Sequence, residues 1–224
     1  KGTYTGAQEM DYAANGTLES GTAKKYVIED TNKSSHLLAV GDYYCADGSI
    51  VSKDVETAPD NVIGIVYHVG NPQPSITTPA TYTETNDALR RDYPSCTHGL
   101  VLAITYPSVG GTQTAAFSTN RDVFFGGWYS TDEDWSDKFV ACTTYNTSIA
   151  AYLGYNNTVL MTMSPNTLVC DKAVSYVEAY REVVSVPASA SSWYLPSLYE
   201  LDELVNVIST VQEVLKTQVE RPWL

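Results

Sequence analysis

The side chains best suited to binding chemistry gather in one short stretch, residues 128–137, which is rich in aromatic rings and carboxylates. Flat aromatic faces suit sugar rings and partner side chains, and carboxylates accept hydrogen bonds from hydroxyls or hold Ca²⁺. The stretch predicts a ligand-binding loop, whose binding residues are Trp128, Tyr129, Asp132, Asp134 and Trp135. The alternative is a solvated loop whose tryptophans pack inward.

Calcium is the one ion that this stretch suggests, and its spacing does not match a known calcium loop. Asp137 stands where an EF-hand requires its turn glycine. The lectin calcium signatures Glu-Pro-Asn and Gln-Pro-Asp are absent, and Gln73-Pro74-Ser75 approaches the second without its carboxylate. We therefore expect no cofactor, with calcium as the open alternative.

Catalytic motifs are missing from the sequence. It contains no HExxH, GxSxG, P-loop or GxGxxG pattern. The three histidines, His36, His68 and His98, lie in or beside apolar segments, as core or strand-end histidines do. Cys96 and His98 are two residues apart on one expected strand, and nothing there orients the histidine as a base. We expect a protein that is not an enzyme, although the paired carboxylates of glycosidases leave no local signature.

Charge and composition narrow the class of partner. The chain has 224 residues, with 26 acidic against 13 basic side chains and a net charge of −13. DNA and RNA binding needs clustered lysine and arginine, so neither nucleic acid is an expected partner. Hydrophobic residues make up 43%, enough for a sizeable core. No apolar run approaches 18 residues, so we expect no membrane insertion of this segment.

The four cysteines are widely spaced along the chain, at Cys45, Cys96, Cys142 and Cys170. No Cys-x-x-Cys pair or Cys/His cluster suggests zinc. Four cysteines allow two disulfides in three connectivities, and they are equally consistent with buried thiols. The sequence leaves this choice open.

Hydrophobic patterning predicts strands in the first two thirds of the chain. The strongest candidates are residues 62–69, apolar enough for burial on both faces, and residues 98–104. Shorter candidates lie at 25–28, 36–40, 123–125, 139–143 and 158–163. Residues 71–92 contain three prolines and read as a long surface loop, and residues 1–24 read as an extended lead-in or connecting segment. The remainder, 25–224, is expected to form one domain.

Two amphipathic helices are expected near the C-terminus. The first begins at Ser164-Pro165 and presents apolar residues at helical spacing up to Val184. The second begins at Ser197, which forms a capping box with Glu200. Its apolar positions are Leu198, Leu201, Leu204, Val205 and Ile208, and its polar face holds Glu200, Asp202, Glu203 and Asn206. Strands followed by helices indicate an α+β fold.

The entry to the second helix carries the most specific pattern in the chain. Its residues are Trp193, Leu195, Pro196, Ser197, Glu200 and Leu201, which we expect to be structural. With the segments 41–49, 62–66 and 98–103, this pattern resembles secreted modules of gut Bacteroidetes that accompany fimbrillin-like proteins. It is also similar to the C-terminal domain family of the Legionella collagen-like protein. The resemblance covers roughly residues 40–224.

The resemblance implies a fold and a setting. The fold is C-type-lectin-like, with small twisted antiparallel sheets, two amphipathic helices and long loops. The setting is extracellular or at the outer-membrane cell surface, on a lipoprotein or pilus-associated protein with a role in adhesion. Its implied partners are a glycan, a host or bacterial surface protein, or other pilus subunits.

Three hypotheses about function follow. The first is a non-catalytic adhesion or recognition module of a fimbria, as a tip or accessory subunit. The second is a structural pilin or assembly subunit with a protein partner, which an unpaired sheet edge would favour because strand addition needs one. The third is a carbohydrate-active enzyme, which requires two facing carboxylates in a cleft.

Overall fold

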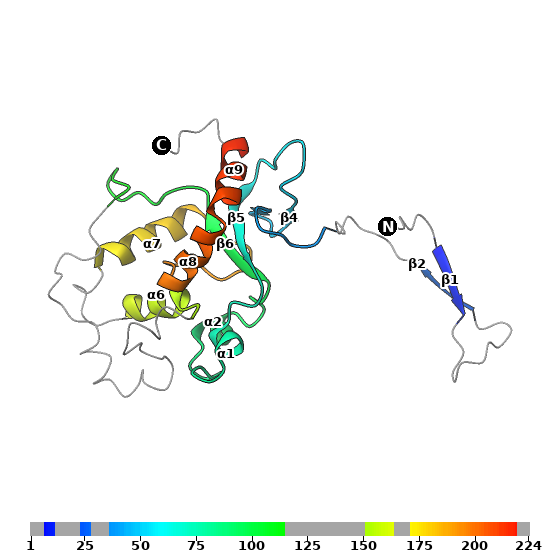
Figure 1. Ribbon diagram of the computed structural model, residues 1–224, viewed down its shortest axis with the longest axis horizontal. Coiled ribbons are helices and arrows are strands. Elements are labelled where there is room, and N and C mark those ends of the chain that lie inside the picture. The colour runs from blue at the N-terminus through cyan, green and yellow to red at the C-terminus, as the bar shows by residue number, and fades with distance from the viewer. Residues whose placement is uncertain (1–6, 12–22, 28–35, 115–150, 164–170, 219–224) are drawn as a thin grey trace. The chain divides into compact units, whose positions relative to one another are not determined.

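The chain divides into two compact units, Lys1–His36 and Leu37–Leu224 (Figure 1). The computed structural model describes residues 7–11, 23–27, 36–114, 151–163 and 171–218. In the first unit, strand β1 (Ala7–Asp11) pairs antiparallel with β2 (Ala23–Val27), with Ala7 opposite Val27. Strand β2 overlaps the strand expected at 25–28. The sequence suggested a boundary at residue 24, and the division into units falls at residue 36.

A four-stranded antiparallel sheet organises the second unit. Its strands are β3 (Tyr43–Cys45), β4 (Ile50–Val51), β5 (Val62–Val69) and β6 (Gly99–Ala103), in the order β4-β3-β5-β6. Strand β5 lies between two neighbours and is buried from Gly64 to Tyr67, which explains its continuous apolar run. A Cβ atom on Gly64 would collide with Val101 Cγ1, so only glycine allows this close pairing of β5 with β6.

Six helices are described in the second unit. They are α1 (Pro74–Thr77), α2 (Ala88–Asp92), α6 (Gly154–Met163), α7 (Asp171–Val183), α8 (Leu198–Asn206) and α9 (Ile208–Gln218). The α+β class with a small antiparallel sheet is therefore confirmed. Within the described ranges, none of the helices is long and apolar enough to cross a membrane.

Three expectations about elements were wrong. Residues 158–163 belong to helix α6, which buries Tyr155, Thr158 and Leu160 together and so shows no one-sided apolar period. Residues 36–40 form no strand. Asp42 Oδ2 accepts a hydrogen bond from Ala39 N at 2.7 Å, and this bond turns the chain. The expected loop at 71–92 contains helices α1 and α2.

A buried carboxylate holds these two short helices together. Asp87 Oδ1 caps α2 by accepting from Arg90 N at 2.9 Å. Its Oδ2 accepts from the backbone N–H and the hydroxyl of Ser75 in α1, at 2.8 and 2.7 Å. A single aspartate thereby joins α1 to α2, while Ala88 and Leu89 of α2 pack in an apolar cluster with Tyr155 and Leu160 of α6.

The main core lies between the sheet and helix α9. It is formed by Tyr43, Ile65, Tyr67, Leu100, Tyr152, Val211 and Val214. Helices α8 and α9 follow one another along the sheet, and both contact β5 (Figure 1). Helix α9 thus covers the sheet through Val211 and Val214, as its apolar spacing requires.

Helix α8 does not sit as its apolar spacing predicts. Leu198, Leu201 and Val205 are 54%, 40% and 64% exposed, whereas Glu200, from the expected polar face, is 1% exposed. The helix is turned so that its capping glutamate faces inward and three of its apolar residues face outward. The reason lies in the hydrogen bonds at its first turn.

Truncation of the central strand tests this core. We expect Ile65→Ala to lower the free energy of unfolding by about 2–5 kcal/mol, because Ile65 is fully buried and the cavity left behind cannot collapse completely. Val69→Ala on the same strand is the control, since Val69 is 44% exposed. Chemical denaturation measures both variants, and equal losses would show that Ile65 is not in the core.

Candidate functional site

The described part of the chain does not include the predicted ligand-binding residues. Trp128, Tyr129, Asp132, Asp134 and Trp135 all lie in the range 115–150, outside the described residues. The structural pattern from Trp193 to Leu201 is described in full, and it forms one wall of a cavity beside strand β6. Cys45 and Cys96 are free thiols, and the other two cysteines lie outside the described ranges.

The capping box predicted from the sequence is present at the start of α8. The Ser197 hydroxyl accepts from Glu200 N at 3.4 Å, and Glu200 Oε2 accepts from Ser197 N at 2.5 Å. The Ser197 hydroxyl also donates to the carbonyl of Ala151 at 3.3 Å. Two N–H groups that a helix start leaves unpaired are thereby satisfied in a buried place.

The tryptophan before this box fixes the incoming chain to helix α7. Trp193 Nε1 donates to the carbonyl of Val184 at 2.9 Å, and Arg181 Nε donates to the carbonyl of Trp193 at 2.7 Å. The ring also packs edge-on against Tyr180, with centroids 5.4 Å apart. Trp193 therefore packs where the chain enters α8 and joins this segment to the C-terminal end of helix α7.

The Glu200 side chain is enclosed by helix α6 and by Tyr194. Tyr194 donates its hydroxyl to Glu200 Oε1 at 3.4 Å. A Cβ atom on Gly154 would collide with Glu200 Oε2 and lie 2.6 Å from the carbonyl of Leu195. The start of α6 must therefore be glycine, because any side chain there would displace the carboxyl.

Burial raises the pKa of Glu200 to about 7, against the lowering effect of its hydrogen bonds with Ser197, Tyr194 and the Gly154 backbone. Desolvation penalises the charged form of a carboxyl, and here it outweighs the donors. Near neutral pH the group therefore exists in both protonation states. Because the Glu200 carboxyl forms part of the capping box of α8, a change in its protonation state changes the hydrogen bonding at the start of this helix.

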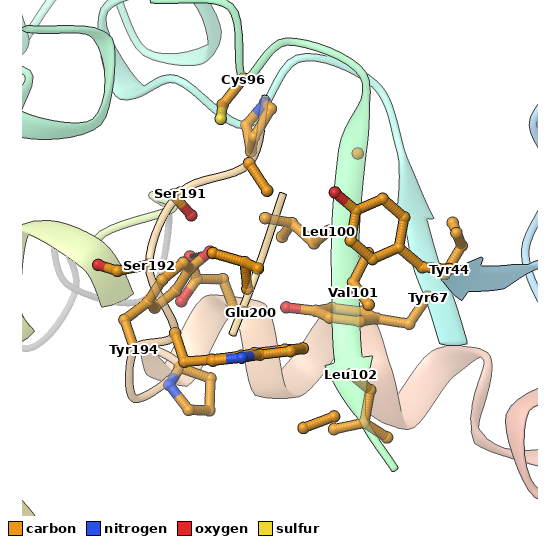
Figure 2. A pocket seen from close by; sticks show the side chains of 18 of the residues that line it. Tyr44, Tyr67, Cys96, Leu100, Val101, Leu102, Ser191, Ser192, Tyr194 and Glu200 are labelled. Carbon is orange, nitrogen blue, oxygen red and sulfur yellow. Dashed lines mark hydrogen bonds between the residues drawn. The ribbon is translucent and has the colours of Figure 1, made fainter. Parts of the chain in front are cut away.

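A cavity of about 600 Å³ lies between β6 and the chain that enters α8. All five residues of β6 line it, and so does every residue from Ser189 to Pro196 on the opposite side. Figure 2 shows the two sides, with Leu100, Val101 and Leu102 on the strand facing the segment of Ser191, Ser192 and Tyr194. We call this space the β6 slot.

Polar groups in the β6 slot are few and mostly neutral. The Tyr44 and Tyr67 hydroxyls point into it (Figure 2), and burial raises the pKa of both phenols, so they remain hydrogen-bonding hydroxyls. Burial likewise raises the pKa of the Cys96 thiol. Glu200 is the one acidic residue of the described lining, which contains no lysine or arginine. Apart from the Glu200 carboxyl, the lining suits uncharged groups.

The described lining does not assemble a nucleophile with a base. Cys96 Sγ lies 3.6 Å from the carbonyl of Ser189, and its raised pKa favours the unreactive thiol. His98 Nδ1 lies 3.3 Å from the hydroxyl of its neighbour Thr97. His68 Nδ1 lies 3.1 Å from Glu203 Oε2 and 3.3 Å from the Tyr152 hydroxyl, which ties α8 to β5.

Metal ligation finds no support in the part of the chain that is described. No group of three or more histidine, cysteine, aspartate or glutamate side chains there is placed to hold an ion. Asp132 and Asp134, whose carboxylates would be available to Ca²⁺, lie outside those ranges. The expectation of no cofactor, with calcium as the alternative, therefore stays a prediction from the sequence.

The sequence did not indicate the β6 slot, because its walls come from distant segments with ordinary apolar residues. One signal was present. Residues 99–103 are apolar without alternation, which indicates a strand whose two faces are both covered. Four of the five are only partly buried in the structure, so the described residues supply only part of the expected cover.

Replacing the buried glutamate tests its titration. Below pH 4.5 the carboxyl is protonated both folded and unfolded, and between pH 4.5 and about 7 only the unfolded chain loses its proton. Stability therefore falls as pH rises through this window and is level above it. We expect the stability of the wild type relative to Glu200→Gln to fall by about 3 kcal/mol across the window.

Denaturant titrations of both proteins at pH 4 and pH 8 measure this difference. Glu182→Gln is the control, because Glu182 is an exposed glutamate on the neighbouring helix α7. A wild-type and a Glu200→Gln protein that change in parallel with pH would show that Glu200 does not titrate in this window.

Gly154 offers a second test of the same packing. Gly154→Ala places a methyl group against the carboxyl of Glu200 and the carbonyl of Leu195. We expect a loss of about 1–3 kcal/mol, typical of overpacking, and a weakened capping box. Thermal unfolding measures the loss. The comparison is Ala190→Gly, at a partly buried position in the segment Ser189–Pro196 that lines the β6 slot. An unchanged melting temperature would contradict this packing.

Comparison with known proteins finds similarity to fimbrial proteins of Bacteroides. No protein-family model matches the chain. It is 33% identical over 216 residues, 90% of its length, to the Bacteroides ovatus protein "Putative fimbrium tip subunit Fim1C". It is also similar to the crystal structure of a fimbrial protein from Bacteroides ovatus, with a TM-score of 0.68 and 30% identity over 82% of the chain. The chain spans 39% of the length of each of these relatives.

Proposed function

We propose that this chain is a non-catalytic recognition module of a fimbria, belonging to a subunit at or near the tip on the cell surface. Two similarities support the proposal, because both relatives are fimbrial proteins and each matches most of the chain. The observation that carries the recognition role is the β6 slot, a largely apolar cavity of about 600 Å³ with a few neutral polar groups. Cavities of this size and character bind ligands or partner side chains.

A protein is the partner that the β6 slot favours. The slot offers hydrogen-bonding hydroxyls from Tyr44 and Tyr67 within apolar walls, which suits a peptide or an apolar side chain. The exposed apolar residues of α8 extend the same surface, since Leu201 is 40% exposed and also lines the slot. Other fimbrial subunits are the partners that the similarities favour.

One observation also supports the second hypothesis, a structural pilin or assembly subunit with a protein partner. Among the described strands, β6 pairs with β5 alone and so ends the sheet. An unpaired edge is what strand addition between subunits requires. Recognition and assembly are two uses of one surface here, and the identity of the partner separates them.

We propose that any glycan is bound by the residues that were predicted from the sequence. We retain Trp128, Tyr129, Asp132, Asp134 and Trp135 as its proposed contacts, in a C-type-lectin-like module. The support is their chemistry, since aromatic faces and carboxylates suit sugar rings and hydroxyls. The carbohydrate-active enzyme is the least supported hypothesis, because the described lining has one carboxylate where that chemistry needs two.

Location on the fimbria is the direct test of the proposed function. Antibodies raised against residues 37–224, coupled to gold and applied to intact cells of the producing bacterium, are expected to mark the ends of fimbriae. A strain without the gene is the control. Label spread over the cell body, or label that appears only after the cells are broken, would contradict the proposal.

A glycan array tests the carbohydrate partner separately. We expect selective binding by the chain to fall at least about tenfold in Trp128→Ala/Trp135→Ala, because the variant loses two stacking surfaces. Running the array with calcium and with chelator shows whether the ion takes part. Tyr106→Ala, at a 56% exposed aromatic residue, is the control. A blank array with a folded protein would leave a protein as the sole proposed partner.

A further inference from the structure

The charge of Glu200 is a feature of the β6 slot that the helix cap does not explain. A capping box takes glutamine as well as glutamate at this position, so the cap alone does not require a group that can ionise. Glu200 is 1% exposed and lines a largely apolar cavity. Among the described residues no ion pair includes it, and its hydrogen-bond donors are neutral. Buried charges are normally paired, so this carboxyl is placed to receive a cation from outside the chain.

The two oxygens of this carboxyl have different surroundings. Oε2 accepts from Ser197 N at 2.5 Å and lies against Gly154, so it is enclosed. Oε1 accepts from the Tyr194 hydroxyl at 3.4 Å, which is long for such a bond. A hydrogen bond from a cation is shorter and about twice as strong, so a cation displaces this hydroxyl. One available oxygen suits a single N–H donor of an ammonium group better than the paired donors of a guanidinium.

The rest of the lining suits an ammonium group on an apolar stem. An ammonium group has three N–H donors. Besides Glu200, the Tyr67 hydroxyl points into the slot, and Ser191 and Ser192 belong to the opposite wall (Figure 2). Burial, and after it the charge of Glu200, raises the pKa of Tyr67, because the two groups are neighbours. The apolar residues 100–102 of β6 provide a surface for methylene groups, such as those of a lysine side chain.

A side chain from another protein has access to this site. Every residue from Gly99 to Ala103 lines the slot, although successive residues of a strand point to opposite faces. The slot therefore reaches around the edge of β6 that no described strand occupies. Its volume of about 600 Å³ is typical of ligand pockets, so it has room for a lysine and for the side chains beside it. The net charge of −13 favours the approach of a basic partner.

We propose that the β6 slot binds a lysine side chain of a partner protein, with the ammonium group on Glu200 Oε1 and the methylene stem along β6. The inference rests on the proposed function, which makes a protein the favoured partner, and it names the side chain that the slot selects. It requires no pairing of the partner's backbone with β6. A free amine and a neutral apolar side chain are the other occupants, which the experiment distinguishes.

Binding of the lysine moves one proton. Because the pKa of Glu200 is about 7, the carboxyl is about nine-tenths protonated at pH 6 and about one-tenth protonated at pH 8. A lysine remains an ammonium at both pH values, so the ion pair forms as the carboxyl gives its proton to the buffer. We therefore expect about 0.9 proton released per lysine bound at pH 6, about 0.1 at pH 8, and about tenfold tighter binding at pH 8.

The other titratable groups near Glu200 contribute little to this pH dependence. Burial raises the pKa of each neighbouring phenol and thiol, so these groups stay neutral between pH 6 and pH 8. They are Tyr67, Tyr152, Tyr194 and Cys96. Glu203, on the same helix, lies 3.1 Å from Nδ1 of His68 on β5, and histidines change charge near neutral pH. Any pH dependence that remains in Glu200→Gln is therefore assigned to His68.

Calorimetric titration of the whole chain tests the proposal. The probe is the pentapeptide Ser-Val-Lys-Val-Ser, acetylated and amidated so that the lysine carries its one charge. Three matched peptides have norleucine, Nε-acetyllysine or arginine in place of the lysine, and pentylamine represents a free amine. We expect the lysine peptide to bind at pH 8 and the other four compounds to bind at least about tenfold more weakly. Two buffers of different ionisation enthalpy give the number of protons released.

Matched variants place the lysine on Glu200 and in the slot. Glu200→Gln keeps the capping box and is expected to bind the lysine peptide at least about tenfold more weakly, without proton release. Glu182→Gln, at an exposed position of α7, is its control. Ser192→Trp fills the slot and is expected to weaken binding at least about tenfold, whereas Ser185→Trp, exposed and outside the lining, is expected to bind as the wild type does. Circular dichroism confirms that the variants fold.

Four outcomes would overturn the proposal. They are no binding of the lysine peptide at millimolar concentration, equal binding of the norleucine peptide, equal binding of the arginine peptide or of pentylamine, and wild-type affinity in Glu200→Gln. These results are separate from the location of the protein. Gold label at fimbrial ends without lysine binding would refute this inference and keep the proposed function, and lysine binding without such label would do the reverse.

Discussion

The hydrogen bonds between Ser197 and Glu200 are the constraint on which the rest of the second unit depends. They start α8, and the Ser197 hydroxyl reaches the carbonyl of Ala151 ahead of α6. Glu200 also receives the Tyr194 hydroxyl and lies against Gly154. Two segments far apart in the sequence, residues 151–154 and 194–200, are thereby joined around one carboxyl, and the course of residues 191–196 follows from that junction.

Burying this carboxyl has two consequences. Its pKa rises to about 7, so desolvation of the charged form weakens the junction at neutral pH. Helix α8 also turns its glutamate inward, which leaves Leu198, Leu201 and Val205 exposed. An ordinary amphipathic helix would bury these residues against the sheet. The orientation that makes the wall of the β6 slot therefore also extends an apolar surface beyond it.

Much of this scaffold was predictable from the sequence, because local chemistry determines it. The capping box at Ser197, the packing of Trp193 at the helix entry, and the buried central strand at 62–69 are each encoded within a few residues. The secondary-structure prediction failed where contacts between distant residues determine the structure. Residues 158–163 have the composition of a strand and form a helix, because α6 is enclosed by neighbours on several sides.

The candidate site, too, was only partly predictable from the sequence. The sequence directed attention to Trp128 and its acidic neighbours, whose side chains suit binding but lie outside the described residues. The β6 slot was missed because its lining consists of common apolar residues and a serine-rich segment, brought together by the sheet and by Trp193.

Amide hydrogen exchange along β6 tests the central claim most directly, namely that the outer edge of this strand is open in the isolated chain. If the edge is open, amides of β6 that point toward β5 exchange slowly, like those of β5 itself, and the alternate amides that point into the β6 slot exchange at least about a hundredfold faster. Slow exchange at every residue from Gly99 to Ala103 would contradict the claim, because it would mean that the edge is already paired.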